Sequence, residues 1–500
     1  MAATPYARAQ GAAPRFTANP FTLGVASGYP RPDGLTLWTR LAPSPDEPGF
    51  GLPPAPVAVR WEIAADDALK SIVASGESVA DPRWAHSVHV DVQGLQPGRE
   101  YWYRFIAGDA SSAIGRTRTA PATGAPVQQL RFVFASCQHY EQGFFGAYRE
   151  MVAEDPDVFL FLGDYIYETS YGGAKVRRHE GPKVNTLDDY RRRYTLYKRD
   201  PDLQAAHAAA PWIVTWDDHE VENDYAGDQS ATREPRERTL ARRAAAYQAY
   251  YENMPLPLAM RPVGPDARIY TSLQYGDIAS FHVLDTRQYR TPQPCQRWDR
   301  GGGNYLANCA ARTDPAATML GPEQEHWFAQ TVGASSTRWN FVAQQCLVSQ
   351  LDLSMGPVQS FWTDAWDGYP ATRARVLGAL HDQRVPNPVF LGGDAHMYWV
   401  NELHLDPDSP DSAAVATEFV GTSVTSRSLV QPWMLPALLA ENPHLRYGNC
   451  DTRGYVRMDL TPGRLTTRLR ASESIASRDA RSRDLATFVV ENGRAVPHRA

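Results

Sequence analysis

The feature of this sequence that most constrains its fold is a change of hydrophobic pattern near residue 126. Before that point, short segments alternate apolar and polar residues between Pro, Gly and Asp; the clearest are LTLWTRL, VAVRWEI, HSVHVDV and YWYRFIA. A period of two is typical of strands that bury one face. Because no long helical segment separates these strands, they predict an all-β sandwich of the fibronectin or immunoglobulin type over residues 20–122.

After residue 126 the apolar residues form continuous runs, and segments of helical character separate them. The runs are LRFVFA, DVFLFL, PWIVTW and NPVFL. Continuous runs are expected of strands buried on both faces, and their alternation with helices predicts a layered α/β domain, which we place at residues 126–470. The Pro-, Ala- and Thr-rich segment TRTAPATGAPVQQ is expected to link the two domains. The alternative is a surface loop within a single domain.

The two ends of the chain have patterns of their own. Residues 1–19 are rich in Ala and show no regular periodicity, so we expect a disordered segment or the remnant of an export leader. Residues 471–500 are charged and then contain the apolar run LATFVV. We expect one strand in this C-terminal segment and expect the segment to pack near the active site.

The five cysteines bear on the compartment. Cys295 and Cys309 flank a loop rich in Gly, Asn and Arg, which a disulfide closes readily; two unpaired surface thiols are the alternative. A disulfide favours a secreted or periplasmic protein. Cys346 lies in an apolar run and is expected to be a buried core thiol. The sequence leaves open whether it pairs with Cys450.

The overall charge excludes some classes of protein. Lys and Arg number 50 against 56 Asp and Glu, a formal net charge of -6, and the chain therefore lacks the basic surface of a sequence-specific nucleic-acid binder. No apolar run approaches the ~20 residues needed to span a bilayer. Apolar residues make up 43% of the chain, enough for a large core, and we expect a monomer.

Four polar clusters each follow directly on one of the apolar runs. They are SCQH at 136–139, GDYIY at 163–167, DDHE at 217–220 and GGDAH at 392–396. A single Asp after a strand is usually a helix N-cap. Four clusters that each follow a strand are stronger evidence for a ligand site, because open α/β sheets bind their ligands beyond the carboxyl ends of the strands. Together the clusters predict a site that holds more than one metal ion.

These motifs resemble a known family. The order GDxxY, DDHE and GDAH is similar to that of the metallophosphoesterases, including the purple acid phosphatases, with Cys137, Asp218 and Asp394 as departures from the usual Asp, Asn and His. With SCQ, WDDHEVEND, LDTRQYR and GGDAHMY, and with the β-sandwich in front, the chain resembles the PhoD-like alkaline phosphatase and phosphodiesterase family. The resemblance covers nearly the whole chain and implies a β-sandwich flanked by helices in the catalytic domain.

The resemblance implies Fe³⁺ together with Ca²⁺, and the donor types agree with it. Thiolate and phenolate are anionic donors that suit a strongly Lewis-acidic ion, and we assign one metal to Cys137, Asp164, Tyr167 and His396. An all-oxygen site suits Ca²⁺; it comprises Asp218 and Asp394, with Asp164 as a bridge. Five anionic donors and one neutral imidazole match a trivalent plus a divalent ion. A second Ca²⁺ through Asp217 or Asn223 is plausible within the family.

Two residues are candidates for direct action on the substrate. His219 stands where the His of the family motif stands, which implies that it stabilises the transferred phosphoryl group or the leaving oxygen; a structural His is the alternative. Arg287 ends the segment FHVLDTR and is a candidate for gripping phosphate oxygens in a bidentate way. Its alternative is a surface ion pair, with Asp285 as one partner.

We therefore predict a secreted, metal-dependent phosphate ester hydrolase that acts by in-line displacement at phosphorus. Monoester, diester, nucleotide diester and phospholipid substrates all remain open, so a phospholipase D-like phosphodiesterase of the same fold is one alternative. The other is a non-enzymatic calcium-binding surface or adhesion protein. Cys137 and Tyr167 argue against the latter, because structural Ca²⁺ sites use oxygen ligands from carboxylates, carbonyls and water.

Overall fold

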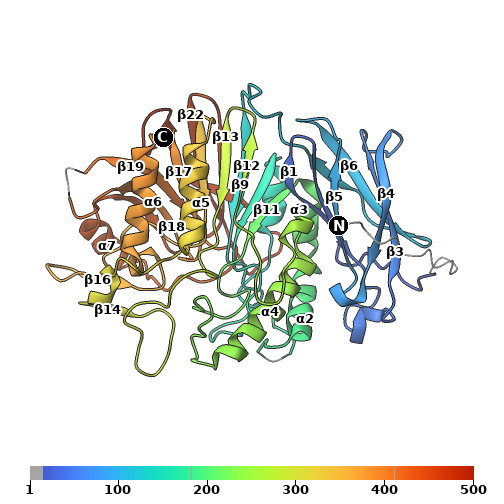
Figure 1. Ribbon diagram of the computed structural model, residues 1–500, viewed down its shortest axis with the longest axis horizontal. Helices are drawn as coiled ribbons and strands as arrows, with labels where there is room; N and C mark the ends of the chain where they lie inside the picture. Colours follow the sequence, from blue (N-terminus) through green and yellow to red (C-terminus); the bar gives the residue numbers. More distant parts are fainter. Residues whose placement is uncertain (1–14, 182, 410–411) are drawn as a thin grey trace.

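Two large sheets form the centre of the computed structural model, which describes residues 15–181, 183–409 and 412–500 (Figure 1). The first has ten strands, in the order β24 (His498–Arg499), β23 (Ser482–Glu491), β22 (Arg464–Ser472), β21 (Arg453–Leu460), β9 (Leu130–Ala135), β10 (Val158–Leu162), β11 (Trp212–Thr215), β1 (Val25–Arg31), β2 (Gly34–Arg40) and β5 (Ser87–Gln93). The second has seven, in the order β12 (Thr271–Tyr275), β13 (Ala279–Val283), β15 (Trp339–Ala343), β17 (Pro388–Gly392), β19 (Ala414–Val420), β18 (Tyr398–His404) and β20 (Leu445–Asn449).

The two sheets pack face to face around an aromatic core. Phe132 of β9 lies edge-on to Phe281 of β13 and Phe341 of β15, with ring centroids 5.1 and 5.0 Å apart. Helices cover the outer faces, α5 and α6 on the seven-stranded sheet and α2 to α4 beside the ten-stranded one (Figure 1). The helices are α1 (Ala147–Ala153), α2 (Leu187–Lys198), α3 (Pro201–Ala209), α4 (Arg236–Asn253), α5 (Pro322–Gly333), α6 (Pro370–Asp382) and α7 (Leu435–Glu441). The predicted β-sandwich flanked by helices is confirmed.

An antiparallel sheet near the N-terminus completes a second, smaller sandwich. It contains β4 (Ile72–Ala80), β3 (Val57–Ala64), β6 (Glu100–Ala107) and β7 (Ala110–Ser111), with β8 (Gly115–Arg118) also paired to β6. Its apolar face packs on β1, β2 and β5, and one buried cluster contains Val59 and Tyr103 together with Leu35 and Leu37. The predicted N-terminal β-sandwich is therefore present.

One sheet of this small sandwich continues into the α/β part, which the sequence did not indicate. Strand β1 pairs with β11 in parallel, with Gly28 opposite Trp212. A Cβ atom at Gly28 would lie 2.5 Å from the Pro255 carbonyl oxygen and 2.8 Å from that of Trp212. Only glycine permits this approach, which joins the two sandwiches through a shared sheet.

Residues 117–129, expected to be a linker, are fastened to the β12–β13 hairpin. Gly124 donates its N–H to the Gly276 carbonyl at 3.3 Å, and the N–H of Asp277 donates to the Ala125 carbonyl at 2.9 Å. Gly276 has a φ of 56°, as the tight turn between the two strands requires. Strands β12 and β13 thus form an antiparallel hairpin that turns at Gly276 and Asp277.

The C-terminal segment forms the edge of the large sheet and also touches a loop after β9. Strands β23 and β24 extend the sheet beyond β22, and β23 contains the predicted LATFVV strand. Between β22 and β23, the Ile475 carbonyl accepts the N–H of Phe144 at 2.7 Å, and the Arg478 carbonyl accepts from Arg149 at 2.9 Å. The prediction for residues 1–19 falls largely outside the described residues.

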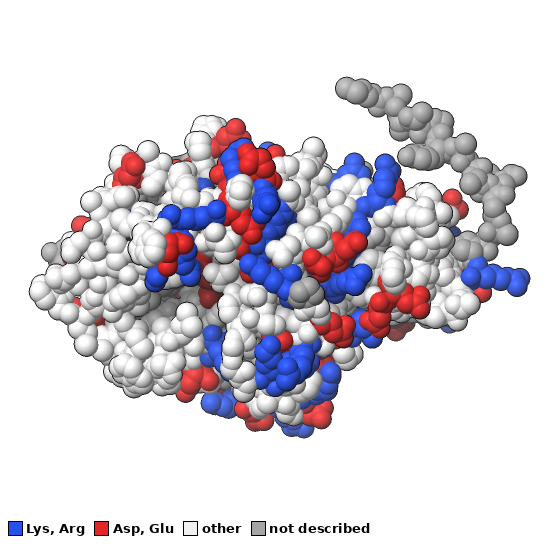
Figure 2. All heavy atoms as spheres, turned by 90° about the horizontal axis from the view of Figure 1, so that it is seen from below, with Lys and Arg blue, Asp and Glu red and all other residues white. Residues whose placement is uncertain are grey.

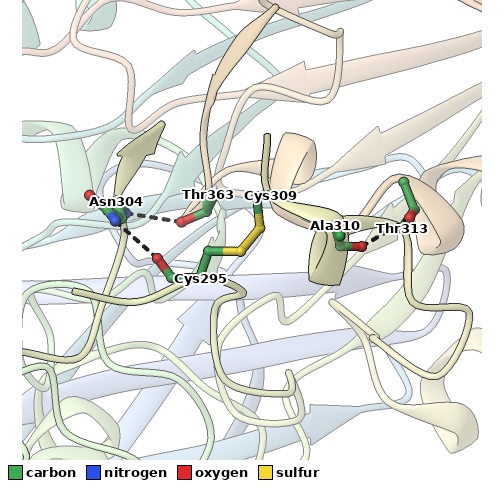
Figure 3. The surroundings of a disulfide bond; sticks show 6 residues. All are labelled: Cys295, Asn304, Cys309, Ala310, Thr313 and Thr363. Atoms are coloured by element: carbon green, nitrogen blue, oxygen red, sulfur yellow. Dashed lines mark hydrogen bonds between the residues drawn. A yellow bond between two sulfur atoms is a disulfide. The ribbon is translucent and has the colours of Figure 1, made fainter. Parts of the chain in front are cut away.

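The predicted disulfide between Cys295 and Cys309 is present, and the loop that it closes contains β14 (Tyr305–Ala307), which pairs with β16 (Ser360–Trp362) in a small two-stranded sheet. Figure 3 shows how this loop is held: Asn304 donates its side-chain amide to the Cys295 carbonyl and its backbone N–H to Thr363 Oγ1, both at 2.9 Å. The remaining three cysteines are free and buried. Cys346 and Cys450 are therefore not paired.

Candidate metal centre

The polar clusters predicted to form a site come together where the two large sheets end. Strands β9, β10 and β11 are parallel neighbours, so the residues that follow them lie side by side: Cys137, Asp164 and Asp217. Asp394 follows β17 of the facing sheet. A parallel bridge between Ser136 and Ser423 ties the two sheets together at this end. Segments far apart in the chain thus supply one buried cluster, as expected at the carboxyl ends of parallel strands.

The first group of candidate ligands contains four predicted residues. The ligand atoms of Cys137, Asp164 and His396 all lie within 4.8 Å of one another. The hydroxyl of Tyr167 donates to Asp164 Oδ2 at 2.8 Å and lies 3.1 Å from His396 Nε2. Ser426 donates to the Tyr167 oxygen at 2.6 Å and so fixes its position. A thiol, a phenol, an imidazole and a carboxylate therefore face one another.

Asp164 also belongs to a second group, with Asp218 and His219, whose ligand atoms again lie within 4.8 Å of one another. This places Asp164 between two sets of donors, as a bridging carboxylate requires. Asp394 lies in a third group, together with Asp217 and Cys346. Of the three residues predicted for the second site, Asp164 and Asp218 lie in one group. Asp394 lies in the other group, with Asp217.

Cys346 is one residue at this site that the sequence did not predict as part of it. It is buried, as predicted, and packs in a core cluster with Val342 and Phe390, but its thiol also faces Asp217 and Asp394. The available signal was its position: Cys346 follows the buried strand WNFVA by three residues, the same context as the four polar clusters. Because apolar residues surround Cys346 in the sequence, its pattern predicted only a core thiol.

Glu220 organises the loops that carry the ligands. Its side chain is fully buried, and its two oxygens accept backbone N–H groups from three residues: Asp164 at 3.1 Å, Tyr165 at 2.5 Å and Asp217 at 2.8 Å. These bonds fix the loops after β10 and β11 relative to each other. The signal in the sequence was the last residue of DDHE, to which the analysis gave no role.

His219 is held between acidic and aromatic neighbours. Its Nδ1 lies 2.8 Å from Glu168 Oε2, and its ring lies 4.1 Å from that of Tyr167. Burial by itself lowers the pKa of His219, but the carboxylates of Asp164, Asp218 and Glu168 raise this pKa well above its usual value. The imidazole is therefore available as a charged donor beside Asp164 and Asp218.

Asn223 lies at the edge of the cluster. The hydroxyl of Tyr171 donates to its Oδ1 at 2.8 Å, and its own backbone N–H donates to Glu168 Oε1 at 3.2 Å. Tyr171 also reaches His219 Nε2 at 3.4 Å. Asn223 is thus linked to the residues around His219.

Arg287 is fully buried behind the ligands. Its guanidinium donates to Asp217 through Nε and to both oxygens of Asp364 through one terminal nitrogen, at 3.0 and 2.8 Å. The other terminal nitrogen lies 3.8 Å from Asp218 Oδ1. Asp285, the partner considered from the sequence, accepts the backbone N–H of Arg287 instead. The guanidinium assigned to substrate phosphate is here occupied by carboxylates.

The chemistry of the donor set fits bound cations. Oδ2 of Asp217 and Oδ1 of Asp218 are buried and have no hydrogen-bond partner, which is costly for a carboxylate unless a positive charge compensates it. Burial raises the pKa values of Cys137, Asp164 and Tyr167 well above their usual values, and the neighbouring negative groups raise them further. A metal ion is the partner that favours the deprotonated form of all three.

The backbone at the candidate ligands is unusual as well. Four of them, which are not glycine, have positive φ angles: Cys137 at 59°, Asp164 and Asp394 at 58° and His396 at 53°. Positive φ angles are unfavourable for residues other than Gly, Asn and Asp. Residues held in this region despite that cost cluster at functional sites. The fold and this cluster define a layered α/β protein with a buried group of candidate metal ligands.

Comparisons with known proteins agree with this class. The family model described as PhoD-like phosphatase matches residues 132–469, and the model of the PhoD-like phosphatase N-terminal domain matches residues 6–121. The chain therefore belongs to the PhoD-like phosphatase family, which confirms the resemblance found in the motifs. It is 44% identical over 489 residues to alkaline phosphatase D of Bacillus subtilis strain 168, which covers 96% of this chain and 82% of the relative.

A solved structure described as PhoD has the same fold. It superposes with a TM-score of 0.92 at 42% identity, over 98% of this chain and 93% of the other. The protein is thus an alkaline phosphatase D-like phosphoesterase that carries a buried group of candidate metal ligands. No helix in the described part of the chain is long and apolar enough to cross a membrane.

Proposed function

We propose that this phosphoric ester hydrolase uses an Fe³⁺ ion and one or two Ca²⁺ ions held in the buried cluster. Cys137, Asp164, Tyr167 and His396 hold the iron in this proposal. Asp218 and Asp394 hold calcium, with Asp164 as the shared ligand. The observation that carries the proposal is the position of Asp164, which lies within 4.8 Å of ligand atoms in both the thiol-containing group and the Asp218 group.

The donor types support the distribution of the two metals. Thiolate and phenolate favour a strongly Lewis-acidic transition metal, whereas carboxylate oxygens alone suit Ca²⁺. A purely structural calcium site, as in an adhesion protein, has no use for the Cys137 thiol, which lies among the ligand atoms. For a second Ca²⁺ the free Oδ2 of Asp217 is the better candidate, because Asn223 is engaged by Tyr171.

When bound, such metal ions lower the pKa of a coordinated water and neutralise charge on the phosphoryl oxygens. The protein's own groups act around this chemistry. The imidazole of His219 donates a hydrogen bond to a phosphoryl or leaving-group oxygen in this scheme. Glu168 orients the imidazole through Nδ1, which leaves Nε2 as the donor. Arg287 acts indirectly in this scheme, by holding Asp217 through its Nε.

We further propose that the enzyme is exported and works as a monomer on a small phosphate ester. The disulfide between Cys295 and Cys309 supports export, because such bonds persist in oxidising compartments. The chain has a net charge of -6 and so does not attract an anionic substrate as a whole. In this proposal the metal ions supply that attraction.

The test combines metal analysis with hydrolysis of a matched pair of aryl phosphate esters, one monoester and one diester. We expect iron and calcium in the purified protein, a visible charge-transfer band from the thiolate and phenolate on iron, and loss of turnover after calcium chelation that added Ca²⁺ restores. A colourless, iron-free protein with full activity would contradict the iron assignment. Full activity with calcium chelated would contradict the second site.

A further inference from the structure

Arg427 is an exposed cationic residue that is anchored beside the candidate metal centre. Its backbone carbonyl oxygen lies 2.9 Å from His396 Nδ1, and its backbone N–H donates to Gln142 Oε1 at 2.7 Å. These two contacts fix the start of the side chain next to a candidate metal ligand. Because the side chain is exposed, its guanidinium can be reached from solvent.

The guanidinium of Arg427 rests on the loop of residues 171–174. Its Nη2 donates to the Ala174 carbonyl at 2.7 Å. Gly173 leaves room for this contact, because a Cβ atom there would lie only 3.0 Å from Arg427 Nη1. A guanidinium has five N–H groups, and within the described residues the Arg427 guanidinium makes this one hydrogen bond. Its other N–H groups are therefore available to a ligand.

The same loop places the guanidinium near the residue that is expected to act on the substrate. The hydroxyl oxygen of Tyr171, at the start of the loop, lies 3.4 Å from His219 Nε2. Arg427 thus begins beside His396, in the first group of candidate ligands, and ends at the loop that contacts His219, in the second group. A phosphate held between these two groups therefore lies close to Arg427.

Several neighbouring cations differ from Arg427 because carboxylates neutralise them. Three side chains of the adjoining segment each have a carboxylate oxygen within 3.4 Å: Lys175 with Glu141, Arg177 with Asp200 and Lys183 with Glu222. Figure 2 shows the same tendency on the side below α2 and β16, where Lys and Arg are interspersed with Asp and Glu over the middle of the face. Within the described part of the chain, Arg427 has a carbonyl oxygen as its side-chain partner and forms no salt bridge. Its positive charge is therefore free to attract an anion.

We propose that Arg427 binds the phosphate of the substrate beside the metal ions, an inference that rests on the proposed function. This is the role first considered for Arg287, which is fully buried and held by carboxylates. The planar guanidinium of Arg427 matches two non-bridging oxygens of one phosphate. A phosphate monoester can carry a second negative charge that a diester lacks, so Arg427 favours monoesters over diesters.

The test is steady-state hydrolysis of an aryl phosphate monoester and the matching diester by the metal-loaded full chain. Arg427→Gln removes the charge and keeps a polar side chain. Arg338→Gln is the matched control, because Arg338 is also exposed but precedes β15 and so lies at the end of the sheet away from the ligands. We expect Arg427→Gln to raise KM for the monoester about tenfold or more, and KM for the diester by less, with kcat changed less than about threefold. The control should change either KM by less than about twofold, since distant exposed charges are screened.

Calorimetric titration with inorganic phosphate separates this inference from the proposed function, because it reports binding without turnover. We expect Arg427→Gln to bind phosphate about tenfold more weakly than the wild type and to keep the wild-type metal content. Unchanged KM and unchanged phosphate binding would refute the inference. A loss of bound metal in this variant would refute it as well, because the side chain would then only hold the loop beside His396. A wild type that binds phosphate through Arg427 but hydrolyses neither ester would refute the proposed function and leave the phosphate site standing.

Discussion

The substitution Glu220→Gln tests how the candidate ligands are positioned. Glu220 accepts three backbone N–H groups, from Asp164, Tyr165 and Asp217, with two of them on Oε2. A glutamine keeps one oxygen acceptor. If that oxygen takes the place of Oε2, the amide NH₂ group faces the N–H of Tyr165, and two donors then oppose each other. The loop that carries Asp164 must shift to relieve this contact.

The cost follows from these contacts. A hydrogen bond to a charged group contributes about 1.5–3 kcal/mol, and a neutral one about 1 kcal/mol. Losing one charge-assisted bond and weakening two to neutral bonds gives a destabilisation of about 2.5–7 kcal/mol. Burial raises the pKa of Glu220 to about 8, against the lowering effect of the N–H donors, so urea unfolding is best compared near pH ~9, where the carboxylate is ionised.

Glu418→Gln is the matched control. Glu418 is also fully buried and accepts two backbone N–H groups, from Val348 and Ser349, and the side-chain amide of Asn401. We expect both variants to lose stability, but only Glu220→Gln to lose bound metal and turnover. A Glu220→Gln protein with wild-type metal content, or with a stability loss below about 1 kcal/mol, would show that the three hydrogen bonds do not position the ligands.

Three further substitutions test other parts of the structure. Cys137→Ala should remove the charge-transfer band and nearly all turnover and keep the chain folded. Cys450→Ala, at another buried free thiol, should keep the band and the turnover. Equal metal content in the two variants would refute the ligand role of Cys137. Replacing Cys295 and Cys309 together by Ser should lower stability by about 3 kcal/mol, because the bond joins residues 14 positions apart and restricts the unfolded chain; an unchanged unfolding midpoint would contradict this. Arg287→Lys should reduce kcat and leave KM for a small ester nearly unchanged, because one ammonium cannot hold two carboxylates in place of a guanidinium; a raised KM with normal kcat would indicate direct contact with substrate.

The sequence predicted the candidate ligands better than it predicted how they are held. Cys137, Asp164 and His396 follow buried strands, and parallel strands bring such residues to one end of a sheet. Nothing local, however, indicates that Arg287 pairs with Asp364, since that contact joins residues 77 positions apart. Charge partners of buried groups depend on tertiary packing, which hydrophobic periodicity does not encode.

Cys346 shows a different limit. A thiol in an apolar run has the pattern of a core residue, and the side chain does pack in the core. Its second role arises because β15 ends next to β17, which brings its thiol to Asp394. The join of β1 to β11 was missed for a similar reason. The glycine at position 28 permits the contact, but a glycine in a strand is compatible with several structures.

The positive φ angles of the candidate ligands indicate that the fold holds them against a local preference. Cys137 has a φ of 59°, which costs a residue with a Cβ atom about 1–2 kcal/mol relative to glycine. Cys137→Gly should therefore be at least as stable as Cys137→Ala, because the relief of strain offsets the loss of about 0.8 kcal/mol from one buried carbon. Ala135→Gly, in β9 two residues earlier, lacks this relief and should destabilise the protein. Urea unfolding of the metal-free variants measures both effects. Each pair measures the cost of replacing an alanine by glycine, at position 137 and at position 135. If the two costs were equal, the backbone at Cys137 would carry no strain. The ligand would then be placed by its side-chain contacts alone.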